Sequence, residues 1–250
     1  MPDRIFTEQK LAELYDHFNP WGGRSGDDEF YMEHILSSDS VLDVGCGTGL
    51  LLRKAREFGH SGRLVGLDPA DAMLEIGRNS RSDIEWTYGV LESARFDQEF
   101  DLVMMSGHAF QVFISDGEVR GVLAAVRRAL TAQGKFVFET RNPSARRWER
   151  WTPEHAIEIA HPAGGLARME HQVDLPIDGD LVSFTTRFTA PTFDGVMESR
   201  STLRFLDESG LNVFLAEAGF EIEAQYGFWD RSPVTETSPE IITVARPASA

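Results

Sequence analysis

The pattern of apolar and polar positions changes once along the chain. From residue 41 to residue 140, short continuous apolar runs alternate with segments whose apolar residues recur at helical spacing. The runs predict strands at residues 41–44, 63–67, 84–88, 100–105 and 134–140. The segments with helical spacing predict helices at residues 50–58, 70–79 and 117–130. Two further helices are predicted before this region, at residues 7–18 and 27–37. Apolar strands alternating with helices are typical of a parallel sheet covered on both faces.

The second pattern is an alternation of polar and apolar residues over 168–206, with no helical segment inside it. Asp178-Gly179 and Asp194-Gly195 are hairpin-turn signals within this stretch. We therefore expect antiparallel strands inserted as a cap. A helix at 207–218 and strands near 220–228 and 240–246 then return the chain to the first sheet.

The composition and net charge limit which binding partners and which cellular compartment are expected. The 250 residues carry a formal net charge of −16, whereas a nucleic-acid binder normally presents a basic surface to phosphates. No apolar run reaches the roughly 18 residues of a membrane helix, and the first four residues do not open a signal segment. A single cysteine excludes an intrachain disulfide. We expect a cytoplasmic monomer or homodimer that binds neither nucleic acid nor membrane.

Three glycines stand between the first predicted strand and the helix that follows it. Gly45, Gly47 and Gly49 would let the backbone approach a ligand closely at the carboxyl end of the strand. Asp68 ends the next strand, 19 residues beyond Gly49, where a carboxylate can accept both hydroxyl hydrogens of a ribose. Together these features indicate a ligand that contains adenosine.

The spacing of the glycines separates two kinds of adenosine ligand. NAD sites use G-x-G-x-x-G, whereas this chain has G-x-G-x-G, which disfavours an NAD-dependent oxidoreductase. The segment Val41-Leu42-Asp43-Val44-Gly45-Cys46-Gly47-Thr48-Gly49 resembles the first motif of class I S-adenosylmethionine-dependent methyltransferases. Residues 67–74 resemble the second motif of that family, and residues 100–103 resemble the start of its fourth strand.

The resemblance covers residues 41–140, and more weakly the rest of the chain, and it implies a fold and a division into parts. The implied fold is α/β, with a Rossmann-like, seven-stranded, mostly parallel sheet, helices on both faces and the inserted antiparallel cap. The implied parts are an N-terminal helical lid (1–40), an S-adenosylmethionine-binding core (41–140), a substrate cap (141–206), and a C-terminal helix and strands that complete the sheet (207–250).

The same resemblance assigns cofactor contacts. It places Asp43 and the glycine loop at the methionine end of the cofactor and Asp68 at the ribose. Where many members have Gly-Asp after the third strand, this chain has Gly89-Val90, so the adenine contact falls to the backbone or to Glu92. Trp21 and Arg24 belong to the lid segment. The full set of expected cofactor-binding residues is Tyr15, Asp43, Gly45, Cys46, Gly47, Asp68, Pro69, Met73, Leu91, Glu92 and Ser106.

Methyl transfer from a sulfonium needs mainly a well-placed nucleophile and the exclusion of water. His108, just after the fourth strand, is our candidate general base, although it could instead fix its loop by hydrogen bonding. Arg141 could bind a carboxylate or a phosphate of the substrate, or it could form a surface ion pair. Gln111 and Trp148 could line the acceptor pocket or serve packing alone. His155, His161 and His171 lack a metal-ligand spacing, so no metal site is expected.

A small-molecule acceptor best fits these features, and the alternatives are a non-catalytic S-adenosylmethionine-binding protein and a nucleic-acid methyltransferase. The motif that amino-directed nucleic-acid enzymes carry after the fourth strand does not match Ser106-Gly107-His108-Ala109. The only cysteine, Cys46, is not part of the Pro-Cys pair that cytosine C5 enzymes use. The identity of the acceptor and of the methylated atom stays open.

Overall fold

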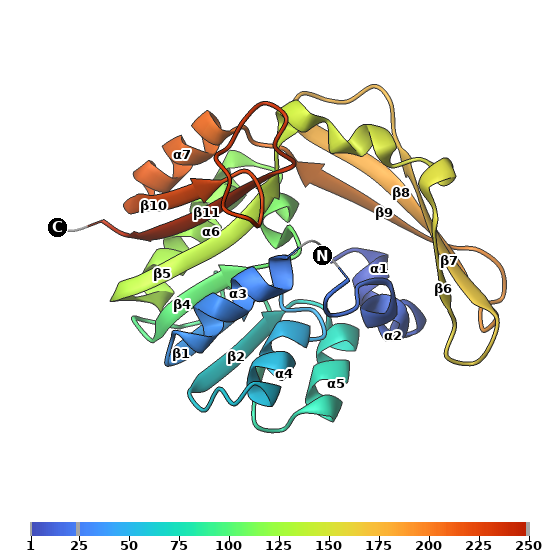
Figure 1. Cartoon of the computed structure of the whole chain (residues 1–250), viewed down its shortest axis with the longest axis horizontal. Coiled ribbons are helices and arrows are strands. Elements are labelled where there is room, and N and C mark those ends of the chain that lie inside the picture. Colours follow the sequence, from blue (N-terminus) through green and yellow to red (C-terminus); the bar gives the residue numbers. More distant parts are fainter. Residues whose placement is uncertain (1, 24–25, 249–250) are drawn as a thin grey trace.

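Two sheets organise the chain, shown in Figure 1 for a computed structural model that describes residues 2–23 and 26–248. The larger sheet has seven strands in the order β10-β11-β5-β4-β1-β2-β3. Its strands β1 to β5 run parallel, and β11 is antiparallel to both of its neighbours. The bounds are β1 Ser40–Val44, β2 Arg63–Asp68, β3 Glu85–Tyr88, β4 Phe100–Met105, β5 Leu130–Arg141, β10 Phe220–Tyr226 and β11 Glu240–Pro247. The expected fold class is confirmed.

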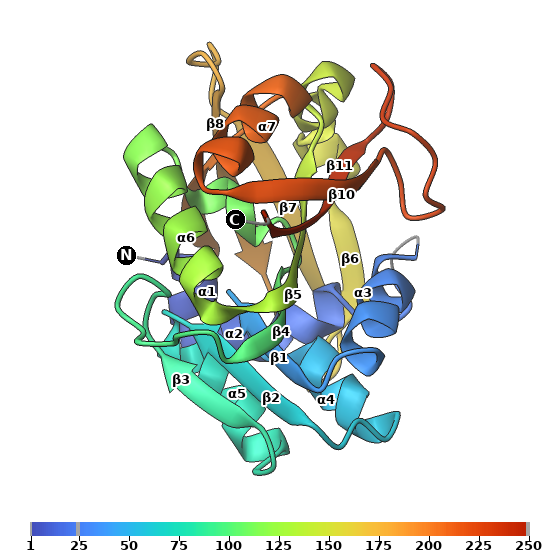
Figure 2. The same ribbon diagram turned by 90° about the vertical axis from the view of Figure 1, so that its left-hand side faces the viewer.

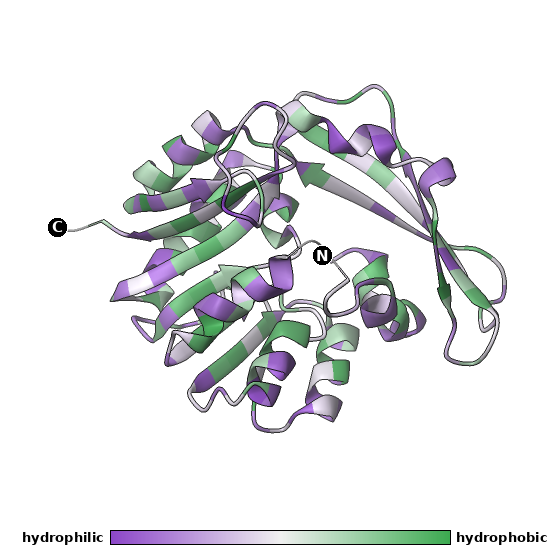
Figure 3. Ribbon diagram, viewed as in Figure 1, coloured by the Kyte–Doolittle hydropathy of each residue, from purple (hydrophilic) through white to green (hydrophobic). Residues whose placement is uncertain are grey.

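Helices cover both faces of this sheet, because its strands are apolar on both sides. Helices α3 and α4 pack on one face, with α5 beside α4, and α6 and α7 pack on the other (Figure 2). Apolar residues accordingly concentrate along the central strands in Figure 3. The bounds are α3 Asp27–Leu36, α4 Leu50–Glu57, α5 Asp71–Ser80, α6 Asp116–Ala129 and α7 Glu208–Glu217.

The second sheet is the expected antiparallel cap, with strand order β6-β7-β8-β9. Gly179 and Gly195, at φ +60° and +100°, lie in the two turns that the Asp-Gly pairs predicted. The short strand β6 was not predicted, because three of its four residues are exposed and give no alternating pattern. The bounds are β6 Ile157–Ala160, β7 Leu166–Val173, β8 Leu181–Thr189 and β9 Met197–Arg204.

The N-terminal segment lies between the two sheets (Figure 1). It forms two helices, α1 Arg4–Thr7 and α2 Gln9–Phe18, where one helix over 7–18 was predicted. The chain is extended at Glu8 (φ −85°, ψ 118°), so the predicted helix was wrong at its start. Leu11 packs against the cap, and Ala12 packs against α5. The segment therefore joins the cap to the large sheet.

Within residues 2–23 and 26–248, four 3-10 helices complete the fold: η1 Ala109–Val112, η2 Pro143–Ala145, η3 Arg147–Arg150 and η4 Pro153–His155. The last three follow β5 and lead into the cap. Among the described residues, no helix has the length and apolar character needed to cross a membrane.

Candidate active site

The glycine loop follows β1 and is held at the carboxyl end of the large sheet. The backbone N–H groups of Gly45 and Cys46 donate to the carbonyl of Leu67, at 2.8 and 3.2 Å, which fixes the loop against the end of β2. Gly47 has φ +57°, and a Cβ there would lie 3.0 Å from Cε of Met73. A larger side chain at position 47 would therefore press on the end of the Met73 side chain, and the positive φ favours glycine there.

Asp68 ends β2 beside this loop. Its carboxylate accepts the backbone N–H groups of Gly47, at 2.8 Å, and of Ala70, at 2.7 Å. Burial raises the pKa of Asp68, and these two hydrogen bonds partly oppose the rise. The expected partners Pro69 and Met73 follow directly, so the structure brings this set of predicted residues together.

Asp43, near the end of β1, is a buried acid with an unsatisfied oxygen. Its side chain is 1% exposed, and Oδ1 has no hydrogen-bond partner among the described residues. Burial, together with the carboxylates of Asp68 and Glu139, raises the pKa of Asp43 to about 8. A buried polar atom without a partner is costly to keep, and a cationic hydrogen-bond donor would satisfy it.

The third glycine of the motif has a packing role. The Trp86 ring, from β3, lies against Gly49, Gly66 and Gly77, each of which would clash with it if it carried a Cβ. The ring is oriented by Nε1, which donates to the carbonyl of Arg81 at 2.9 Å. Gly49 is therefore needed to accommodate an indole ring, whatever else the loop binds.

The remaining expected cofactor residues are placed less uniformly. Tyr15, on α2, is half-buried against the start of α5 with Met73. Cys46 is buried and burial raises the pKa of its thiol, which suits a packing role rather than a nucleophile. Ser106 is half-buried at the end of β4, as expected. Leu91 and Glu92 differ in burial: Leu91 is buried in the core shared with α6, whereas Glu92 is exposed. Arg24 lies outside the described residues.

His108 stands in a network of acids that the sequence did not predict. It has φ +65°, and its backbone N–H donates to Oε1 of Glu139 at 2.7 Å. Its Nε2 lies 2.9 Å from Oε2 of Glu240. Tyr31 donates its hydroxyl to the other oxygen of Glu139 and lies 3.2 Å from the carbonyl of Met105. Both ring nitrogens of His108 thus face carboxylates, with Nδ1 3.9 Å from Glu139.

Burial controls the charges of this network. Glu139 is 2% exposed, and burial raises its pKa, although His108 and Tyr31 oppose the rise. Burial and the nearby Glu139 also raise the pKa of Tyr31, which keeps the phenol protonated as a donor. One signal in the sequence pointed here: Glu139 is an acid that directly follows the apolar run Phe136-Val137-Phe138. Its partners come from distant segments and gave no such signal.

Arg141 and Gln111 meet at the end of β5, as expected of substrate-binding candidates. The backbone N–H of Arg141 and one terminal guanidinium nitrogen donate to Oε1 of Gln111, at 3.2 and 3.0 Å. Gln111 is 1% exposed and donates its own amide to the carbonyl of Arg204. The Arg141 guanidinium lies over the ring of Trp151, 5.1 Å from its centroid.

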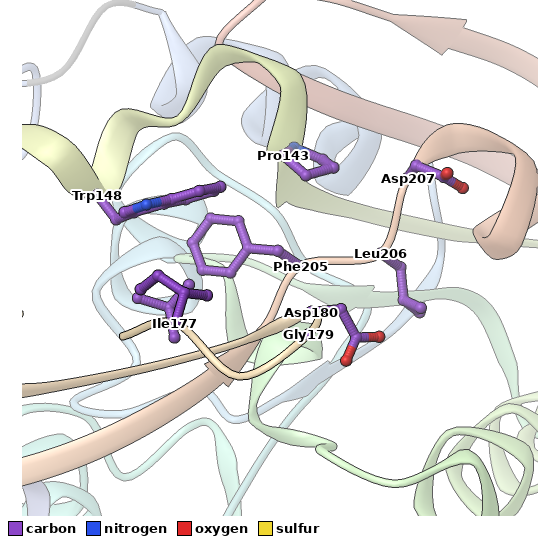
Figure 4. A pocket seen from close by; sticks show the side chains of 9 residues that line it. Pro143, Trp148, Ile177, Gly179, Asp180, Phe205, Leu206 and Asp207 are labelled. Atoms are coloured by element: carbon purple, nitrogen blue, oxygen red, sulfur yellow. The ribbon is translucent and has the colours of Figure 1, made fainter. Parts of the chain in front are cut away.

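Trp148 lies apart from this group. It lines a pocket of about 390 Å³ between the segment after β5, the β7–β8 turn and the segment before α7 (Figure 4). Phe205 also lines this pocket, and its ring centroid lies 4.7 Å from that of Trp148 and 6.1 Å from that of Trp151. His108, Gln111 and Arg141 do not line this pocket. Among the described residues, no cluster of three or more His, Cys, Asp or Glu could hold a metal ion.

Comparison with known proteins agrees with this arrangement. Residues 41–134 match the model of a methyltransferase domain. The chain is 28% identical, over 84% of its length and 83% of the relative's, to the cypemycin N-terminal methyltransferase of a Streptomyces species. Its fold is similar to that of the CcbJ methyltransferase from Streptomyces caelestis (TM-score 0.77, 17% identity, 99% and 100% of the two chains). It is also similar to CalS10, an amino pentose methyltransferase from Micromonospora echinaspora (TM-score 0.69, 21% identity, 94% and 97%).

The matched region holds β1 to β4, the glycine loop and Asp68, which are the features that carried the resemblance. The fold similarity extends beyond this region, since it covers 99% of the chain in the CcbJ comparison. Residues 41–134 are therefore similar to a methyltransferase domain, and the whole chain has the fold of solved S-adenosylmethionine-dependent methyltransferases.

Proposed function

We propose that this enzyme methylates an amine on a small-molecule acceptor held between the end of β5 and the cap. The observation that carries the cofactor part of the proposal is the buried acid Asp43, whose Oδ1 is unsatisfied beside the glycine loop. S-Adenosylmethionine carries an ammonium group that could donate to this oxygen. The residues present therefore fit this cofactor.

The cofactor supplies a methyl group on a positively charged sulfur, which is already activated for displacement. Asp43 and the backbone of the glycine loop would hold its methionine end. Asp68 would accept the ribose hydroxyls, since its carboxylate already faces Gly47 in the loop. Tyr15 and Met73 would cover it from the lid and from α5.

The enzyme's own contribution is placement and the exclusion of water. The lid is fixed over the loop by Asp16, which accepts the Thr48 hydroxyl at 2.6 Å and pairs with Arg53. It is also fixed to the cap, where the backbone N–H of Ile5 donates to the hydroxyl of Ser199 at 3.0 Å. Both contacts keep the lid between the two sheets.

An amine acceptor is supported by two observations. The first is chemical: the carboxylates of Glu139 and Glu240 flank His108, with Nε2 2.9 Å from Oε2 of Glu240. A proton released by the acceptor could therefore pass to the His108–Glu240 pair. The second is the activity for which several relatives are named, which include an N-terminal methyltransferase and N-methyltransferases of sugars.

The proposal includes the division of the chain at residues 40, 140 and 206, a cytoplasmic location, and a monomer or homodimer. The single cysteine supports the location, since no disulfide is needed. Light scattering tests the oligomeric state, and fractionation of the producing cells tests the location.

The test of function is a screen of paired acceptors, in which each amine is matched with the alcohol of the same skeleton. Release of S-adenosylhomocysteine is measured with the wild type and with Gly47→Val as the inactive control. We expect turnover with amines only. Turnover with the alcohols, or none with either set while the cofactor binds, would contradict the proposed acceptor class.

A further inference from the structure

The loop after β4 carries His108 in a backbone conformation that favours glycine. Gly107 and His108 both lie in the left-handed region, at φ +66° and +65°. Glycine adopts this conformation readily, whereas for histidine it costs free energy. The backbone N–H of His108 donates to Oε1 of Glu139 at 2.7 Å. This short hydrogen bond opposes the cost and helps to hold residue 108 in place.

Both oxygens of Glu139 accept a hydrogen bond, and the second donor is Tyr31, on α3. The Tyr31 hydroxyl donates to Oε2 and also lies 3.2 Å from the carbonyl of Met105, the last residue of β4. Tyr31 is 1% exposed and Glu139 is 2% exposed, so water does not compete for these contacts. A buried carboxyl with both oxygens bonded keeps a single orientation. Tyr31 therefore fixes the acid that holds residue 108.

Glu139 is itself supported by the large sheet. Its backbone is paired with that of Ile242 on β11, and the neighbouring Phe138 is paired with Met105 on β4. Phe138 is also fully buried in the core shared with α6. A side chain on a strand with partners on both sides is placed more precisely than one on a loop. The acid can therefore act as a fixed support for the loop beside it.

The loop that Glu139 holds contacts two other parts of the site. A Cβ on Gly45, in the glycine loop, would lie 3.0 Å from the Cβ of Ala109, the residue after His108. Nε2 of His108 lies 2.9 Å from Oε2 of Glu240, on β11. A rotation of the backbone at residue 108 would therefore separate the imidazole from Glu240 and change its position relative to the glycine loop.

We propose that Glu139 is a positioning residue for His108 and that Tyr31 holds Glu139 in the required orientation. Glu139 keeps residue 108 in the left-handed conformation, and this conformation sets where the imidazole lies. The inference rests on the proposed function, which gives His108 its part in the reaction. It adds that turnover depends on two buried side chains, one of them on α3, that take no part in proton transfer themselves.

The first measurement needs no methyl acceptor. In the full-length protein, the backbone amide of His108 is followed by nuclear magnetic resonance and hydrogen exchange. Glu139→Ala removes the acceptor of this N–H, so the amide signal should shift and the proton should exchange about tenfold faster or more. Glu139→Gln keeps a carbonyl oxygen at the same place and should stay near the wild-type values. Unchanged exchange in the alanine variant, or exchange in the glutamine variant as fast as with alanine, overturns the proposal.

The second measurement is turnover with an amine found in the acceptor screen. Glu139→Ala should lower kcat about 10²-fold, the scale of a misplaced catalytic group, with a much smaller change in the affinity for S-adenosylhomocysteine. Glu139→Gln should restore most of kcat, and Tyr31→Phe should lower it about tenfold. In the His108→Ala background, Glu139→Ala should lower kcat no further, because the two residues act as one unit. A further loss in the double variant would overturn the proposal.

Two matched controls come from the same side of the molecule. Tyr226 packs on the ring of Phe30 at 6.2 Å, as Tyr31 does at 5.9 Å, measured between centroids. Glu223, on β10, pairs with Lys135 at 2.8 Å. Neither belongs to the network around His108, so Tyr226→Phe and Glu223→Gln should leave both measurements near the wild-type values.

Glu139→Asp serves if the alanine variant does not fold, because it keeps the acid and withdraws the carboxyl by one methylene. It should speed exchange at residue 108 and lower kcat, and wild-type values for both would overturn the proposal. Failure of the proposed function gives a different result. Full turnover in His108→Ala contradicts the part assigned to His108, while the amide measurement still decides whether Glu139 holds residue 108.

Discussion

The most informative single change is Asp43→Asn, because it removes a buried ionisable group and keeps its shape. At pH 5 the Asp43 carboxyl is protonated in the folded chain and ionised in the unfolded chain, since its pKa rises from 3.8 to about 8 on folding. Folding therefore takes up a proton at this position. Asparagine cannot ionise in either state, so the variant lacks this contribution.

The sign follows from proton linkage. A folded state that binds more protons than the unfolded state loses stability as the pH rises, here between about pH 4 and pH 8. One pKa unit corresponds to about 1.4 kcal/mol, so the shift gives a loss on the order of 5 kcal/mol by pH 8. We expect Asp43→Asn to match the wild type near pH 4 and to exceed it by several kcal/mol at pH 8.

Cofactor binding should change in the opposite direction. The cationic ligand favours the ionised Asp43 carboxylate, so wild-type affinity should increase as the pH rises from 6 to 8, while the variant should bind more weakly at pH 8. Urea unfolding and calorimetry at pH 5, 6.5 and 8 measure both effects. Asp71→Asn is the control, since its side chain is 69% exposed. Parallel pH profiles for the wild type and Asp43→Asn would refute the reasoning.

Four further outcomes test other parts of the site. Asp68→Ala should weaken S-adenosylhomocysteine binding by about 1.5–3 kcal/mol in calorimetry, and unchanged heats would count against the ribose contact. Gly47→Val should fold, by circular dichroism, yet not bind the cofactor, because the backbone has φ +57° and Met73 is close; normal binding would move the cofactor elsewhere. His108→Ala should keep cofactor affinity and lower turnover by about 10²–10⁴-fold, and full turnover would leave placement as the mechanism. Asp16→Ala should speed hydrogen exchange in residues 4–18 and raise the KM for the cofactor, whereas unchanged exchange would show that the lid is held by packing alone.

The sequence predicted the large sheet well because its strands are buried on both faces and are therefore continuous apolar runs. The cap strands β7 to β9 were visible for a different reason, since each has one buried and one exposed face. Strand β6 has neither property and was missed. The helix break at Glu8 has no proline or glycine to mark it, so helical periodicity carried the predicted helix back to Thr7, the last residue of α1, and the rest of α1 was missed.

Some residues of the site could likewise be predicted from the sequence, and others could not. The glycine loop and Asp68 were predictable together, because the carboxyl ends of neighbouring parallel strands meet at one edge of a sheet. Glu240 reaches His108 only because β11 returns antiparallel beside β5, a pairing that no local pattern encodes. His171 was judged on its spacing to other histidines, whereas its neighbours come from β5 and from the segment before β6.

The position of Trp86 links the side-chain volumes that are tolerated at four positions. A single bulky ring from the edge strand β3 occupies space left by Gly49, Gly66 and Gly77, which come from the ligand loop, from β2 and from α5. An alanine at any of the three needs a smaller side chain at position 86, and a smaller side chain there leaves a void that an alanine could fill. In a mutational library Gly77→Ala should therefore recover only in company with a substitution of Trp86, whereas Gly49→Ala keeps the strain of its φ of +69° in either case.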